Sequence, residues 1–128
     1  MKHTHLKPIV FDNVTRKVIG AAIQVHRILG PHFEELTYQR ALVFEFQEKG
    51  LGFGREVQIP IHYRGTKLHT RRVDFVVEDC LVEIKAKAAL DGRDFEQTLS
   101  YLKASGYRVA LLLNFGAKQL EIKRIVNG

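Results

Sequence analysis

The chain is poor in sulfur and lacks tryptophan: its 128 residues include one cysteine and one methionine. A single cysteine, Cys80, excludes an internal disulfide, and zinc sites built from several thiolates are excluded with it. Because Cys80 follows a predicted hairpin turn and has no histidine near it in the sequence, we expect an unreactive thiol.

Long apolar runs are also missing. None approaches the roughly 18 residues that a helix needs to cross a bilayer. The first eight residues, Met1 to Pro8, contain no apolar signal-peptide core. These absences predict a cytoplasmic protein with no membrane partner.

Internal repeats, low-complexity tracts and linkers are likewise absent, so the length predicts a single domain over residues 1–128. An apolar content of 45% and a mean hydropathy of -0.13 are typical of a globular protein. The net charge of +6 and a pI near 9.6 favour a polyanionic partner such as nucleic acid.

Hydrophobic periodicity and turn residues divide the chain into helices and strands. Asn13 or Thr15 is a candidate cap for a first helix that ends near Leu29. Further helices are predicted at about 33–49 and 93–105, and strands at about 55–63, 68–77, 80–86, 107–113 and 120–126. This order predicts an α/β fold, a three-layer sandwich in which the third helix connects parallel strands of a mixed sheet.

Apolar stripes predict which helix faces are buried. The stripe of the first helix comprises Val18, Ala21, Ala22, Val25 and Ile28 or Leu29. That of the second comprises Leu36, Val43, Phe44 and Phe46, and that of the third Phe95, Leu99 and Leu102.

The most informative chemistry lies on two adjacent predicted strands. If Glu78 and Asp79 form a two-residue turn, Val77 pairs with Cys80, and Asp74 then lies directly opposite Glu83. Two carboxylates at that spacing repel each other unless a cation or a lysine compensates, and Lys85 points to the same face. A three-residue turn would instead place Asp74 and Glu83 on opposite faces.

A solvated strand face with alternating charges is the competing interpretation of this hairpin. The residues around the two carboxylates argue against it, because they are apolar on both faces of the strands. Asp74 and Glu83 are therefore expected to be partly buried, and buried carboxylates require a cationic partner. Basic side chains on or beside the hairpin would suit a phosphate backbone: Arg71, Arg72, Lys85 and Lys87.

Several spaced motifs together resemble the GxxExxY proteins, a branch of the PD-(D/E)XK nuclease superfamily, with features similar to RecB-type exonucleases. The resemblance extends over most of the chain. It rests on Val25–Pro31, Glu35–Tyr38, Val73-Asp74, Glu83-Ile84-Lys85, Gln97–Lys103, Leu113–Gly116 and Lys123-Arg124.

The resemblance implies a PD-(D/E)XK nuclease-like sandwich with an extra N-terminal helix, acting as a metal-dependent nuclease on DNA. Asp74 and Glu83, with Glu35 and the Ile84 carbonyl as further candidates, would bind Mg²⁺ or Mn²⁺. Lys85 would orient the attacking water or stabilise the charge on the phosphorus. The remaining implied site residues, which would position the phosphate or the end of Lys85, are Gln97 and Tyr101.

Two positions depart from the family pattern. His32 replaces the glycine that opens the GxxExxY motif, which raises the question of whether the backbone there needs a positive φ. Val73 stands where the superfamily name has proline. An alternative function is therefore a non-catalytic module that binds nucleic acid or protein. Pairing of two copies through the predicted edge strand 120–126 would give a homodimer.

Overall fold

The computed structural model describes the backbone of residues 6–127 and the side chains of residues 13–127. Its three helices and five strands follow one another in the predicted order. The helices are α1 (Leu6–Leu29), α2 (Glu35–Glu48) and α3 (Gly92–Ser105). The strands are β1 (Phe53–Tyr63), β2 (Thr66–Val77), β3 (Cys80–Lys85), β4 (Val109–Asn114) and β5 (Glu121–Val126).

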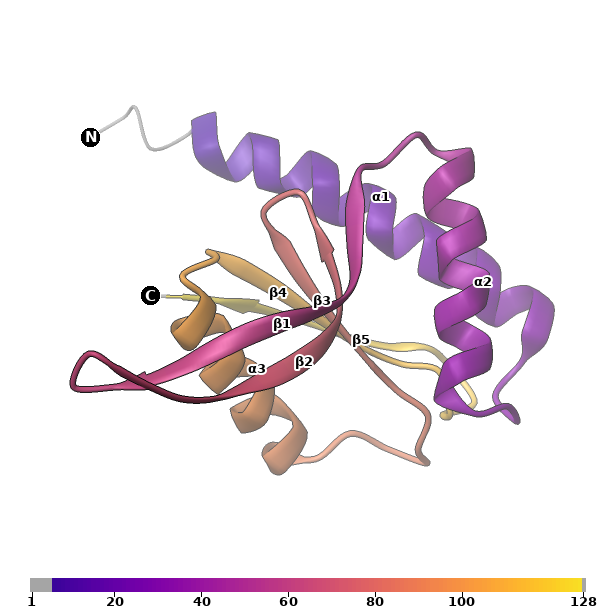
Figure 1. Ribbon diagram of the computed structural model, residues 1–128. Coiled ribbons are helices and arrows are strands. Elements are labelled where there is room, and N and C mark those ends of the chain that lie inside the picture. Colours follow the sequence, from indigo (N-terminus) through magenta and orange to yellow (C-terminus); the bar gives the residue numbers. More distant parts are fainter. Residues whose placement is uncertain (1–5, 128) are drawn as a thin grey trace.

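The strands form one mixed sheet in the order β1-β2-β3-β4-β5, so β1 and β5 are its edges. Only β3 and β4 are parallel, and α3 connects them, as predicted for a crossover helix. Helices α1 and α2 pack on one face of the sheet and α3 packs on the other (Figure 1). The expected three-layer α/β sandwich with an N-terminal helix is confirmed.

The helices differ from the prediction in their starts and in their buried faces. α1 begins at Leu6, so Asn13 and Thr15 lie inside the helix instead of capping it. Both residues cost only a few tenths of a kcal/mol in a helix interior, too little to set its start. Ile28 is exposed at the end of α1, whereas Leu29 packs against the core.

In α2 and α3 the apolar stripe proved a poor guide to burial. Leu36, Phe44 and Phe95 are exposed although they were predicted to be core residues. The buried faces instead include polar side chains, which hydrophobicity alone does not identify. They consist of Tyr38, Gln39, Leu42 and Phe46 in α2, and Asp94, Thr98 and Leu102 in α3.

The β1–β2 hairpin extends well beyond the rest of the sheet. Pairing between β2 and β3 covers only Phe75 to Val77, whereas β1 and β2 pair from Phe53 to the tip. We call the part beyond the central sheet, Val57–Val73, the arm; its tip reaches past α3 (Figure 1). Arg64 and Gly65 both have positive φ at the tip, a conformation that matches the twist of a two-residue hairpin turn.

At the root of the arm, alternate side chains of this hairpin change the face of the sheet to which they point. Phe53 and Phe75 pack against Phe46 of α2, whereas Val57 and Val73 belong to the cluster around α3. Side chains normally alternate between faces, so residues two apart should share one. The exchange coincides with Glu56, which adopts φ 54° and leaves the pairing opposite Asp74 unformed.

α1 is long enough in residues to raise the question of a membrane span. Within the described residues, neither α1 nor another helix combines sufficient length with sufficient apolar character to cross a bilayer.

Candidate active site

The register of the β2–β3 hairpin brings the two predicted carboxylates together. Glu78 and Asp79 form the turn, and Val77 pairs with Cys80, as the two-residue turn requires. Beyond the pair of Phe75 and Val82, backbone hydrogen bonds between the two strands are replaced by hydrogen bonds from backbone N–H groups to carboxylate side chains. The Asp74 N–H donates to Glu83 Oε1 at 3.0 Å, and the Ile84 N–H donates to Asp74 Oδ2 at 2.8 Å.

Asp74 therefore lies at a fork in the sheet, where its strand departs from β3 on one side and from regular pairing with β1 on the other. Backbone groups released at the fork are hydrogen-bonded by the carboxylates themselves. This arrangement explains why acidic side chains are tolerated between two otherwise apolar strands.

A polar chain from α2 and β1 completes the surroundings of Asp74. Gln39 Nε2 donates to Asp74 Oδ1 at 2.9 Å, and Arg55 Nε donates to Gln39 Oε1 at 2.8 Å. Neither residue was predicted to belong to the site. The available signal was the helical spacing: Gln39 lies four residues after Glu35, on the same face of α2.

Burial and charge oppose ionisation of Glu83. Its side chain is buried, and desolvation together with the Asp74 carboxylate raises its pKa to about 8. The pKa of Glu35 is also raised, mainly by desolvation and partly by Asp74, while Lys85 and the Ala86 backbone act in the opposite direction. Asp74 and Lys85 act electrostatically on both glutamates, Glu35 and Glu83. The four side chains, which come from α2, β2 and β3, are therefore neighbours.

The raised pKa of Glu83 predicts how the metal-free protein responds to pH. Between about pH 4.5 and 8 the folded state holds a proton that the unfolded chain has lost, so this group's contribution to stability falls as pH rises. The Glu83→Gln variant should have a flatter dependence of the unfolding free energy on pH over that range. Urea titrations in EDTA at several pH values would measure it.

Glu96→Gln, on the exposed surface of α3, is the matched control and should retain the wild-type slope. A Glu83→Gln variant with the same pH dependence as wild type would contradict the assignment. Added Mg²⁺ should reduce the wild-type slope, because a bound cation favours the ionised carboxylate.

The two predicted residues of α3 lie apart from this hydrogen-bonded group. Gln97 is exposed, and Tyr101 packs partly against the apolar cluster between the sheet and α3. Within residues 13–127, no hydrogen bond joins Gln97 or Tyr101 to the carboxylates or to Lys85. Their roles in the site stay predictions.

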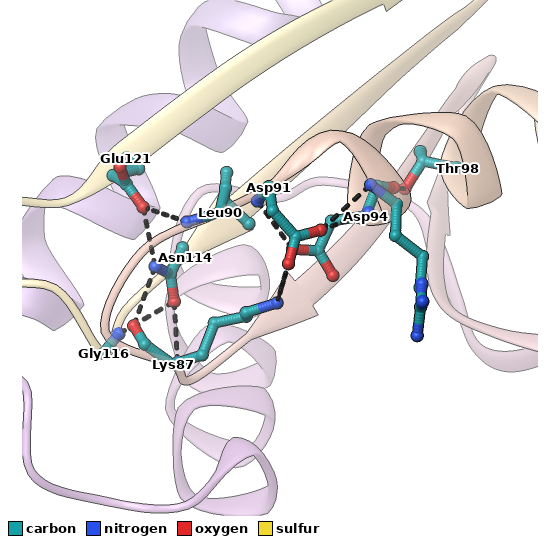
Figure 2. Close-up of polar contacts among 9 residues, drawn as sticks. Lys87, Leu90, Asp91, Asp94, Thr98, Asn114, Gly116 and Glu121 are labelled. Atoms are coloured by element: carbon teal, nitrogen blue, oxygen red, sulfur yellow. Dashed lines mark hydrogen bonds and ion pairs between the residues drawn. The ribbon is translucent and has the colours of Figure 1, made fainter.

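The segment after Lys85 is held by buried Asn114 (Figure 2). Asn114 Oδ1 accepts from the Lys87 and Gly116 N–H groups at 3.0 and 3.1 Å. Its Nδ2 donates to the Lys87 carbonyl at 2.9 Å and to Glu121 Oε1 at 2.8 Å. All the hydrogen-bonding capacity of this amide is used, so Asn114 fixes the chain where it leaves β3.

Two further contacts tighten the same junction. The Phe115 N–H donates to the Lys85 carbonyl at 2.8 Å. A Cβ atom on Gly116 would lie 2.3 Å from Lys87 N, so only glycine permits this approach of the two backbones. The Leu113–Gly116 motif thus anchors the end of the strand that carries Lys85.

Lys87 was expected to face a phosphate backbone, and the structure gives it another role. Its Nζ lies 2.7 Å from Asp94 Oδ2 and 3.2 Å from Asp91 Oδ2 (Figure 2). These two carboxylates, at the start of α3, raise the pKa of Lys87. Their charges partly offset that of the lysine, and contact of Lys87 with a phosphate backbone stays a prediction. Lys87 joins the loop after β3 to the capped end of α3.

Tyr38 of the GxxExxY-like motif has a structural role. Its ring stacks on Phe115 with centroids 4.7 Å apart, and its hydroxyl donates to the Gly30 carbonyl. Gly30 takes the positive φ of this loop, whereas His32 is absent from the positive-φ residues. Histidine at position 32 therefore introduces no left-handed strain. His26 Nε2 is hydrogen-bonded to the Ala117 carbonyl at 3.0 Å, also a structural contact.

One comparison decides the family. The model of the PD-(D/E)XK nuclease superfamily matches residues 12–125, nearly the whole chain. The chain belongs to this superfamily. No curated protein and no solved structure matches it. The sequence predicts that the motif after which the superfamily is named lies at the fork, with Asp74 as the aspartate, Glu83-Ile84-Lys85 as the (D/E)XK run and Val73 at the proline position; this residue assignment stays a prediction.

The donor set of this PD-(D/E)XK site fits a hard divalent cation. Within the described residues, no three His, Cys, Asp or Glu side chains form a group that could hold a metal ion, so Glu35 does not complete a three-carboxylate cluster in this conformation. Two carboxylates suffice for Mg²⁺, which retains several waters. Asp74 and Glu83 meet that requirement, and a cation between them would lower the pKa of Glu83 by favouring its ionised form.

Proposed function

We propose that this protein is a Mg²⁺- or Mn²⁺-dependent nuclease of the GxxExxY type that hydrolyses phosphodiester bonds of DNA. The observation that supports the proposal best is the fork at Asp74. There, the buried Glu83 carboxylate lies against the half-buried Asp74 carboxylate with an unfavourable charge balance, and Lys85 is the cationic side chain that acts electrostatically on Glu83. A cytoplasmic location and pairing of two copies through the edge strand β5 belong to the same proposal.

In the proposed mechanism, Asp74 and Glu83 would hold the cation, and Glu35 and the Ile84 carbonyl are the further ligands that the family resemblance implies. A bound cation would polarise a phosphoryl oxygen and lower the pKa of a water. Lys85 places its ammonium beside the same phosphate and offsets the negative charge that develops there. Gln39 and Arg55 keep the Asp74 carboxylate oriented, and Asn114 keeps the end of β3 in place.

Replacement of Lys85 separates this nuclease from a non-catalytic binding module. We expect Lys85→Ala to lower the single-turnover cleavage rate by a factor on the order of 100, the scale seen when one preorganised partner of the transition state is removed. The affinity for DNA should change little, because the protein carries 20 lysine and arginine side chains and loses one. Single-turnover kinetics with Mn²⁺ and a labelled duplex would measure the rate.

Lys103→Ala, an exposed substitution on α3, removes the same charge away from the fork and should leave the rate unchanged. Absence of metal-dependent cleavage by the wild-type protein would contradict the proposal. A Lys85→Ala variant that loses affinity while keeping the rate would favour the binding module.

A further inference from the structure

The arm, Val57–Val73, has a charge composition unlike that of the rest of the chain. It contains no aspartate or glutamate, and its Lys and Arg residues give it a formal charge of +4, against +6 for all 128 residues. Every one of its basic side chains is exposed. They are His62, Arg64, Lys67, His69, Arg71 and Arg72.

Only one face of the arm is used in folding. Ile59 is buried, and it packs together with Val73 in the cluster that includes Leu102 of α3. Residues on the opposite face are paired across the two strands: Gln58 with Arg72, Pro60 with Thr70, and His62 with Lys67. All of these are exposed except Thr70, which is half-buried and donates to Gln58 Oε1 at 2.6 Å. The face is polar, basic and not covered by the described part of the chain.

The position of the arm links this surface to the candidate site. Val73, its last residue, directly precedes Asp74, and regular β1–β2 pairing continues outward from the fork. At about 3.4 Å per residue, the seven steps from Val73 to Thr66 give a reach of about 24 Å. Consecutive phosphates on one DNA strand are about 3.4 Å apart along the helix axis, so the reach corresponds to about seven base pairs.

From these observations we infer that the arm is a two-stranded β-ribbon that binds duplex DNA on one side of the scissile phosphate. The inference rests on the proposed function for its substrate class. A two-stranded ribbon fits the major groove, which is about 12 Å wide, and exposed basic side chains on both strands can contact the flanking phosphates. Binding of single strands relies on several stacking aromatic side chains, and the arm has only one aromatic residue, Tyr63.

The test compares two charge-matched double variants in EDTA, where binding is measured without metal-dependent cleavage. Arg64→Ala with Lys67→Ala removes two charges from the tip of the arm. Lys17→Ala with Arg27→Ala removes the same two residue types from the exposed surface of α1. Fluorescence anisotropy would give the affinity for a labelled 20-bp duplex, and for one of its strands alone, over a range of salt concentrations.

The arm variant should bind the duplex about 10- to 100-fold more weakly at 0.1 M salt. Its log-log salt slope should be smaller by about 1.8, because about 0.9 is lost for each phosphate contact. The α1 variant should bind like wild type. Equal weakening by both variants, or an arm variant with wild-type duplex affinity, would overturn the inference. So would a loss confined to the single strand.

The same variants distinguish failure of the arm from failure of the nuclease proposal. At saturating duplex with Mn²⁺, the arm variant should cleave at the wild-type rate, because it retains Asp74, Glu83 and Lys85. Weakened duplex binding together with an inactive wild-type protein would uphold the arm and refute the nuclease. A reduced rate at saturation would show that the tip acts in the chemical step, contrary to the inference.

Discussion

The Asp74→Asn variant should lose Mn²⁺-dependent DNA cleavage by a factor on the order of 1000 or more. The substitution removes one of the two carboxylate charges proposed to bind the cation, while the shape of the side chain is retained. Affinity for Mn²⁺ should fall in parallel, and calorimetric titration in the absence of DNA would measure it.

Asparagine is the informative replacement because Asp74 also serves the fold. Its carboxylate accepts from the Ile84 N–H and from the Gln39 amide. An asparagine carbonyl can still accept from Ile84, so the fork loses about one hydrogen bond, worth about 1 kcal/mol. Alanine would remove both acceptors. A lower cleavage rate could then result either from loss of metal binding or from local disorder at the fork.

Asp79→Asn is the matched control, since it makes the same chemical change at an exposed position in the β2–β3 turn. It should leave cleavage and Mn²⁺ affinity at wild-type values. Cleavage retained by purified Asp74→Asn would place the activity elsewhere in the molecule. Thermal unfolding of all three proteins in EDTA would establish that the variants are folded.

The Gly116→Ala variant should be destabilised by about 3 kcal/mol and should also lose cleavage activity. The added Cβ would lie 2.3 Å from Lys87 N, 2.5 Å from the Ala86 carbonyl carbon and 2.7 Å from the Lys87 oxygen. All three are backbone atoms, so rotation of a side chain cannot relieve the overlap, and the segment after Lys85 must move. Its movement would strain the Asn114 hydrogen bonds and displace the end of β3. Urea unfolding and single-turnover cleavage would measure the two effects.

Gly92→Ala is the matched control: it makes the same chemical change, but we expect no loss of stability. A Cβ on Gly92, the first residue of α3, meets no atom within 4 Å, so alanine there should be neutral or stabilising by up to about 1 kcal/mol. If Gly116→Ala were as stable as wild type, the close approach at this junction would not constrain the protein.

The parts of the molecule that follow from local rules could be predicted from the sequence. The hairpin register is one example, because Glu78 and Asp79 interrupt two apolar strands and a two-residue turn then fixes every pair. The proximity of Asp74 and Glu83, which a hydrogen bond from the Asp74 N–H to Glu83 Oε1 joins, was expected from that register. A parallel pair of strands connected by the third helix was also expected, whereas the order of all five strands was not predicted.

Other features depend on contacts between distant residues, and the sequence carried little signal for them. Gln39 is buried because it bonds both Asp74 and Arg55, although an amide in a helix is usually exposed. Asn114 is likewise buried by its bonds to Lys87 and Glu121. Periodicity predicted burial of Phe44 and Phe95 and not of these polar residues, because it depends on hydrophobicity alone and contains no information on hydrogen bonds.

Because the two faces of the hairpin exchange at Glu56, the length of the arm can change without a change in the geometry of the fork. A residue added to each strand near the tip would invert the side chains beyond the insertion. The fork would be unaffected, because Glu56 and Asp74 set its geometry at the root. Each such addition lengthens the ribbon by about 3.4 Å, close to the spacing of one base pair. If the arm binds duplex DNA as inferred, its footprint would change in steps of about one base pair while the proposed reaction centre is inherited intact.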